Sequence, residues 1–250
     1  VFRNAESFNS ALLGWNTEQV ISFDETFAGA SRYALDDLAC WDTPRVVSMN
    51  GMFQSASAFN GLISTWDTSR VETMAYMFAD ASSFNVDISA WDVSSVTSME
   101  SMYSNATSFR QDLSTWQVYS LQEADSMFEG ATSFDSEICA WPIRENATIK
   151  DMFANAVSFD QDLCSWEAES SNNTLFSRLD CPVDVDGDLP CVMCSSDTGS
   201  CIVEPVYPSS PEIPGFCPEA ESTEAPPDSG AMTHVCLSLV IGLVLMFIEI

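Results

Sequence analysis

Large apolar residues recur along the chain at one nearly constant step. Tryptophan occupies positions 15, 41, 66, 91, 116, 141 and 166, so the first interval is 26 residues and every later one is 25. A fixed period of this size indicates stacked repeats, because a unit this short buries its apolar side chains only against neighbouring copies. We therefore predict a tandem-repeat domain of about seven coils over residues 1–180. Its core contains a ladder of Trp15, Trp41, Trp66, Trp91, Trp116, Trp141 and Trp166.

The residues around each tryptophan follow the same step. Leu or Ile stands three positions before it, and Phe or Tyr about seven before it. Within one unit, Trp91 and Val93 are two residues apart, which is typical of a short strand. Apolar residues between Val96 and Ala106 recur every three or four positions, which favours a short helix or helical turn. Each 25-residue coil is thus predicted to hold one of each.

The unit Met77-Phe-x-x-Ala-x-x-Phe84-Asn-x-Asp-Ile88-Ser-x-Trp91-Asp-Val93-x-x-Val96-x-x-Met99 resembles a known repeat. It is similar to that of the BspA-like leucine-rich-repeat surface proteins, in the branch first described in mycoplasma lipoproteins. The likeness covers about residues 1–180. It implies a right-handed, leucine-rich-repeat-like solenoid, exposure at the cell surface, adhesion or protein binding, and no known active site.

The repeat pattern decays after Trp166, and the composition then changes. We expect a cysteine-rich cap over residues 181–203, and a stalk rich in proline and acidic residues over 204–230. A hydrophobic anchor signal or membrane segment follows over 231–250. The chain begins inside a repeat, so we also expect earlier repeats to precede it.

The apolar run Val235–Ile248 is shorter than the roughly 20 residues of a membrane-spanning helix. No Lys or Arg follows it, and small residues precede it. This pattern favours a glycolipid anchor attached at Asp228 or Ser229, with a terminal membrane helix as the alternative. Three sequons fit an exported chain; they begin at Asn105, Asn146 and Asn172. We therefore predict a C-terminally anchored protein on the outer face of the plasma membrane.

Charge restricts the partners. The chain has 37 acidic residues against 8 Lys and Arg, a formal net charge of −29. Nucleic-acid binding requires a basic surface, so this class is excluded. The remaining partners are neutral, cationic or bridged by a metal ion.

The sequence contains no recognisable catalytic set. The single histidine, His234, stands beside the hydrophobic tail, so no Ser/His/Asp or Cys/His arrangement can be built. Among so many acids, pairs of carboxylates leave a glycan-acting enzyme as an alternative. We expect a protein that is not an enzyme.

The cysteines suit an oxidising compartment, and disulfides are the favoured interpretation. Cys139 and Cys164 occupy the same position in adjacent coils, with two free thiols as the alternative. The remaining candidates are Cys181, Cys191, Cys194 and Cys201. The pair Cys191-Val-Met-Cys194 also fits half of a zinc site.

Acidic residues form two columns. One follows the tryptophans and runs through Asp42, Asp67, Asp92 and Gln117, which we predict to be a ligand-binding face. The other precedes them and runs through Asp87, Asp112, Glu137 and Asp162. Bonds to nearby backbone N–H groups are the simplest role for such residues. The alternative is a bridging Ca²⁺, for which Asp184, Asp186 and Asp188 form a second candidate site; no other cofactor is expected.

These observations favour a cell-surface recognition or adhesion module that presents a repeat face to a protein or glycan. A structural spacer or coat component without a discrete ligand is the alternative.

Overall fold

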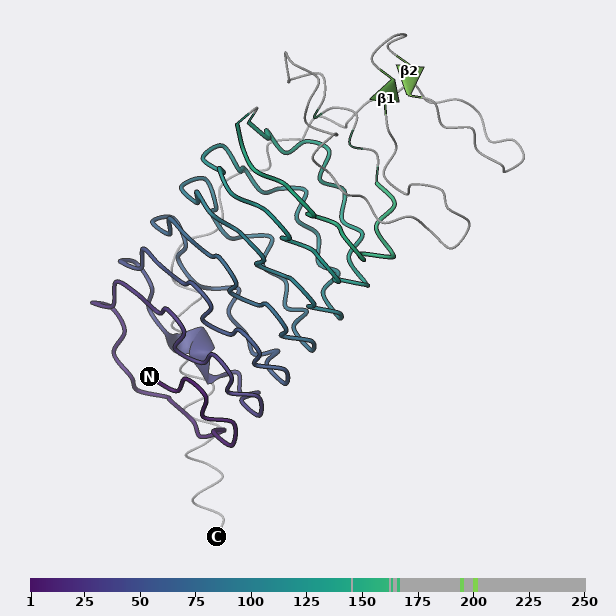
Figure 1. The fold of residues 1–250 in the computed structure, drawn as a ribbon. Helices are drawn as coiled ribbons and strands as arrows, with labels where there is room; N and C mark the ends of the chain where they lie inside the picture. Colours follow the sequence, from purple (N-terminus) through teal and green to yellow (C-terminus); the bar gives the residue numbers. More distant parts are fainter. Residues whose placement is uncertain (145, 162, 164–165, 167–193, 196–199, 202–250) are drawn as a thin grey trace.

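The computed structural model describes residues 1–144, 146–161, 163, 166, 194–195 and 200–201. Within residues 1–161 the chain winds into coils that lie side by side (Figure 1). Isolated parallel bridges join one residue of each coil to its counterpart in the next. They run through Ser22, Ser48, Thr73, Ser98, Glu123 and Thr148. Successive coils are therefore in register, one repeat period apart.

Turns replace the predicted strand and helix in each coil. In the described part of residues 1–161 the only helix is η1 (Asp37–Cys40), a short 3-10 helix, and no strand occurs. Backbone bonds join residues three apart instead, such as Met52 N to Met49 O at 3.2 Å and Ala56 N to Phe53 O at 3.0 Å. A chain of such turns repeats every three or four residues, which produces the spacing from which a helix was predicted.

Two rows of residues, each repeated from coil to coil, have a left-handed backbone. The first row comprises Glu25, Gly51, Tyr76, Ser101, Ser126 and Asp151, and the second comprises Asn4, Gly29, Ser55, Asp80, Asn105, Gly130 and Asn155. A positive φ at the third position of a turn is typical of a type II turn. Here it directs the N–H group at the next coil: Tyr76 N donates to Glu100 O at 2.8 Å, and Ser55 N to Ala79 O at 2.7 Å. These bonds offset the cost of about 1–2 kcal/mol that a non-glycine residue incurs in this conformation.

Aromatic rings form continuous rows through the core. One row joins Phe53 to Phe78 at 5.7 Å between ring centroids, with the ring planes only 2° apart. Within each coil its members stack on the next row, as Phe53 does on Phe59 at 3.8 Å. The tryptophans form a third row, in which Trp66 and Trp91 lie 6.4 Å apart. Stacking of identical positions thus gives one continuous apolar core.

The tryptophan row also carries hydrogen bonds between coils. The indole N–H of Trp91 donates to Ile63 O at 3.1 Å, and those of Trp66, Trp116, Trp141 and Trp166 make the equivalent bond. Six tryptophans are buried as predicted, whereas Trp15 is 46% exposed. Trp15 still stacks on Trp41, with 6.1 Å between the ring centroids.

The second coil accommodates one extra residue, and the adjustments are local. Buried Asp37 in η1 accepts bonds from Leu12 N and from the Tyr33 hydroxyl, the latter at 2.7 Å. In the next coil, a Cβ atom on Gly61 would lie 2.2 Å from Leu35 O, so only glycine fits there. The indole N–H of Trp41 is buried with no hydrogen-bond partner in the described structure.

The two strands form a separate antiparallel pair. β1 (Cys194–Ser195) pairs with β2 (Ser200–Cys201), with Cys194 opposite Cys201. Among the described residues, no helix has the length and apolar character required to cross a bilayer. The predicted stalk and anchor, including Asp228 and Ser229, lie outside the described residues.

Candidate ligand-binding surface

The predicted ligand-binding column is exposed. Asp42, Asp67, Asp92 and Gln117 all face solvent on successive coils. Two of them bond within their own turns: Asp67 Oδ1 accepts from Ser69 N at 3.1 Å, and Asp92 Oδ1 from Ser94 N at 3.0 Å. The carboxylates are thus partly used by the backbone, which is the simpler of the two predicted roles.

The second acidic column behaves in the same way. Asp87 Oδ1 accepts a bond from Ser89 N at 3.0 Å, and Asp112 Oδ1 accepts one from Ser114 N at 2.8 Å. Burial alone would raise the pKa of Asp112, but hydrogen bonds from Ser114 and Ser136 outweigh burial and lower it. Asp112 is therefore held as a charged acceptor of turn hydrogen bonds.

No metal centre is formed by the described residues. In that part of the chain, no three His, Cys, Asp or Glu side chains lie close enough to hold an ion. The alternative of a bridging Ca²⁺ in the acidic columns stays a prediction. The other candidate, Asp184, Asp186 and Asp188, lies outside the described residues.

The cysteines and sequons are described in part. Cys139 is disulfide-bonded, and so is Cys40, which the sequence analysis did not single out. Cys164 lies outside the described residues, so its predicted bond with Cys139 stays a prediction; Cys181 and Cys191 lie outside them too. Asn105 and Asn146 are exposed, and the Asn105 amide donates to Asp80 Oδ1 at 3.0 Å. The sequon at Asn172 is not among the described residues.

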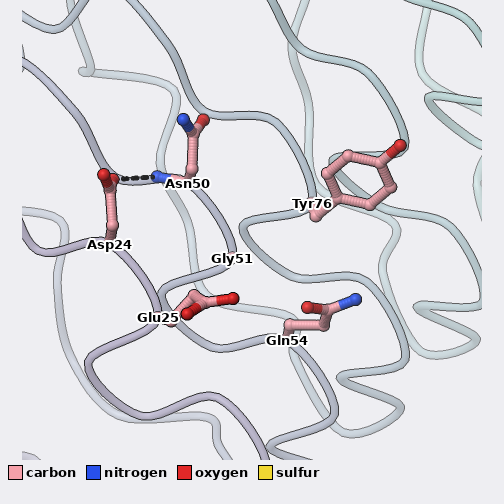
Figure 2. A pocket seen from close by; sticks show the side chains of 6 residues that line it. All are labelled: Asp24, Glu25, Asn50, Gly51, Gln54 and Tyr76. Carbon is pink, nitrogen blue, oxygen red and sulfur yellow. Dashed lines mark hydrogen bonds between the residues drawn. The ribbon is translucent and has the colours of Figure 1, made fainter. Parts of the chain in front are cut away.

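The structure adds a surface hollow that the sequence did not indicate. It has a volume of about 300 Å³ and is lined by Asp24, Glu25, Asn50, Gly51, Gln54 and Tyr76 (Figure 2). Glu25, Gly51 and Tyr76 belong to the first left-handed row, one residue from each of three successive coils. Gly51 is buried and contributes no side chain to the lining of the hollow. A glycine in a row of larger residues was the available signal, but only in-register stacking makes that row visible.

Several side chains around the hollow are held in place. The Tyr76 hydroxyl donates to Glu100, and this bond is the main reason that the pKa of Tyr76 is raised, with burial second. Asp24 Oδ1 accepts a bond from Asn50 N at 2.9 Å, shown as the dashed line in Figure 2. Glu25 pairs with Arg3. The hollow therefore has an aromatic wall and polar groups in defined positions.

Comparisons with known proteins identify one family. The family model described as Mycoplasma protein of unknown function, DUF285, matches residues 1–60, 32–141 and 87–179. These overlapping matches together cover residues 1–179, well over half of the chain. No curated protein and no solved structure matches the chain.

Proposed function

The chain belongs to the family described as Mycoplasma protein of unknown function, DUF285, and from this premise we propose that it is a cell-surface recognition module. Its stacked coils would present a binding face to an extracellular protein or glycan, without catalysing a reaction. Within this proposal the architecture is a right-handed, leucine-rich-repeat-like solenoid of the BspA-like type. The parallel bridges and the in-register aromatic rows support that assignment.

One observation supports recognition over a passive spacer. Core rows keep one kind of residue in every coil, whereas exposed rows change from coil to coil. The exposed residues Ser69, Tyr119 and Arg144, for example, lie whole periods apart and are all different. A spacer needs only the constant core. A surface that differs at each coil provides a distinct set of contacts, as binding one ligand requires.

The large negative charge limits the classes of partner that we expect. Seven Lys and Arg among residues 1–161 leave the described surface strongly acidic. Such a field repels anionic partners and accelerates encounters with cationic ones, while neutral ligands are unaffected. We therefore expect a neutral or cationic partner on the outer side of the membrane, with the protein held there by its C-terminus.

The test is a binding screen with the full chain. Labelled protein is applied to arrays of glycans and of extracellular proteins, and partners are measured again with a surface variant. That variant carries Tyr76→Ser and Arg144→Ser, both at exposed positions. A control variant carries Thr107→Ser and Thr132→Ser, which keep a hydroxyl at each position.

We expect a partner that binds the original chain and the control but binds the surface variant at least tenfold more weakly. Both variants should melt within a few degrees of the original chain, because no core residue is changed. A chain that binds nothing on either array, or a partner indifferent to the surface variant, would favour the spacer role instead.

A further inference from the structure

The hollow beside Gly51, called the notch below, is lined by residues of three successive coils. In the first left-handed row, Glu25 precedes Gly51 and Tyr76 follows it. The notch therefore has a carboxylate on one side of Gly51 and an aromatic ring on the other. A Cβ atom on Gly51 would lie 3.4 Å from Gln54 Oε1 and 3.6 Å from Glu25 Cγ. Both are ordinary contact distances, so a single added side-chain atom at Gly51 would touch both neighbouring side chains.

The aromatic wall is fixed before any ligand arrives. Tyr76 is 37% exposed, so part of its ring is free to contact a ligand. Its backbone N–H donates to Glu100 O at 2.8 Å, and its hydroxyl donates to the Glu100 carboxylate. Because both the backbone and the hydroxyl of Tyr76 are hydrogen-bonded, its side chain loses little conformational entropy when a ligand binds, which favours affinity.

Two polar side chains beside Gly51, those of Gln54 and Glu25, line the notch, and one Glu25 carboxylate oxygen is paired with Arg3. The Gln54 backbone N–H donates to Gly51 O at 3.1 Å. Its side-chain amide lies next to the Glu25 carboxylate in the view of Figure 2. Gln54 offers a donor and an acceptor, and Glu25 offers acceptors only. A hydroxyl group both donates and accepts, so it can satisfy the two side chains together.

We propose that this notch binds one neutral sugar residue of a glycan, with the sugar ring against Tyr76 and its hydroxyls on Gln54 and Glu25. This inference rests on the recognition role proposed above and names a ligand class for it. A volume of about 300 Å³ lies at the lower end of the range for small-molecule sites, as one sugar ring requires.

Charged ligands fit the notch less well. Anionic sugars would meet the carboxylates of Asp24 and Glu25 at short range, where like charges repel. A primary ammonium group donates hydrogen bonds but accepts none, so the Gln54 N–H₂ group would stay unpaired.

The decisive variant fills the notch without disturbing the backbone. In Gly51→Ser the new side chain occupies the space between Glu25 and Gln54. Ser101 and Ser126 already occupy this row with φ of 51° and 55°, close to the 57° of Gly51, so the coil tolerates serine there. Tyr76→Ser removes the aromatic wall, and Tyr119→Ser removes an exposed tyrosine elsewhere as the matched control.

Ligand-observed NMR with the full chain measures binding of methyl α-glucoside, methyl β-galactoside and methyl α-mannoside at millimolar concentration. Glucuronic acid and n-butylamine serve as anionic and cationic probes. We expect at least one neutral glycoside to bind, and to bind at least tenfold more weakly to Gly51→Ser and Tyr76→Ser but equally to Tyr119→Ser.

Binding of none of the neutral glycosides overturns this inference, as does binding that Gly51→Ser leaves unchanged. Preference of the notch for n-butylamine would overturn it in favour of a cationic partner. If the array partner still binds while the glycosides fail, only the sugar inference falls. If both experiments fail, the recognition role falls with it.

Discussion

At the scale of single residues, two buried tyrosines differ in whether their hydroxyl group has a hydrogen-bond partner. Tyr103 occupies a core row that elsewhere holds phenylalanine, and its buried hydroxyl has no hydrogen-bond partner in the described structure. The Tyr33 hydroxyl is also buried but donates to Asp37 at 2.7 Å. Burial raises the pKa of both phenols, and for Tyr33 the bond to Asp37 raises it further.

The same substitution should therefore act in opposite directions at these two positions. Tyr103→Phe removes a buried polar group without a partner, and we expect the free energy of unfolding to rise by about 1 kcal/mol. Tyr33→Phe leaves Asp37 with one bond fewer, and we expect a loss of about 1 kcal/mol. Urea unfolding of the two variants, followed by tryptophan fluorescence, measures both. If both variants changed the free energy of unfolding by the same amount and in the same direction, the hydrogen bond of the Tyr33 hydroxyl would not distinguish the two positions.

At this scale the sequence identified the core residues but not the backbone conformation of individual residues. Recurrence identified the buried positions, because only residues packed against their own copies need to be the same in every coil. The left-handed conformations at Ser55 and Asp80 could not be predicted, since neither residue is glycine. Their conformation depends on N–H bonds to the next coil, which exist only once the coils are stacked.

At the scale of the coil, the apolar spacing was correct but its interpretation was not unique. Positions three and four apart fit one face of a helix, and they fit equally well a series of turns closed by bonds between residues three apart. Hydrogen bonds between coils decide between a helix and a series of turns. Phe78 N, for example, donates to Met102 O of the next coil at 2.9 Å. A helix would use such N–H groups within one coil.

The indole bonds between coils can be tested with two tryptophans of nearly equal burial. Trp91 is 3% exposed and donates to Ile63 O at 3.1 Å, whereas Trp41 is 4% exposed and its N–H has no partner. Phenylalanine at either position loses similar packing, but only Trp91→Phe also loses a hydrogen bond. We expect Trp91→Phe to be the more destabilising by about 1 kcal/mol in thermal or urea unfolding.

A control for this comparison is Trp116→Phe, which should resemble Trp91→Phe because its indole donates to Ile88 O at 3.2 Å. If Trp41→Phe were as costly as both, the indole bonds would contribute nothing measurable, and ring packing alone would hold this row together.

At the scale of the whole molecule, the site depends on the register of the stack. The acidic columns could be predicted from the sequence, and their members lie on the surface except for Asp162, which is outside the described residues. The notch at Gly51 could not be read, because Glu25 and Tyr76 become neighbours only when three coils align. Side chains that are a whole period apart in the sequence thus form one site.

Register itself can be tested by deletion. Removing residues 77–101 excises one full period and joins Tyr76 to Met102, so every row stays continuous and Trp116 should donate to Ile63 O. Removing residues 77–89 excises about half a period and sets every later row against the wrong neighbour. Because stability in a stacked repeat is roughly a sum of neighbour terms, the first deletion should lower the melting temperature only modestly.

The second deletion should abolish cooperative melting and the near-ultraviolet circular dichroism of the stacked tryptophans, since apolar rows would meet polar ones at the break. The informative comparison is between the two variants, because the shorter deletion removes fewer residues and yet should do more damage. If both deletions melted alike, the coils would be packing without register. The notch would then have no reason to form, and its proposed ligand would lose its basis.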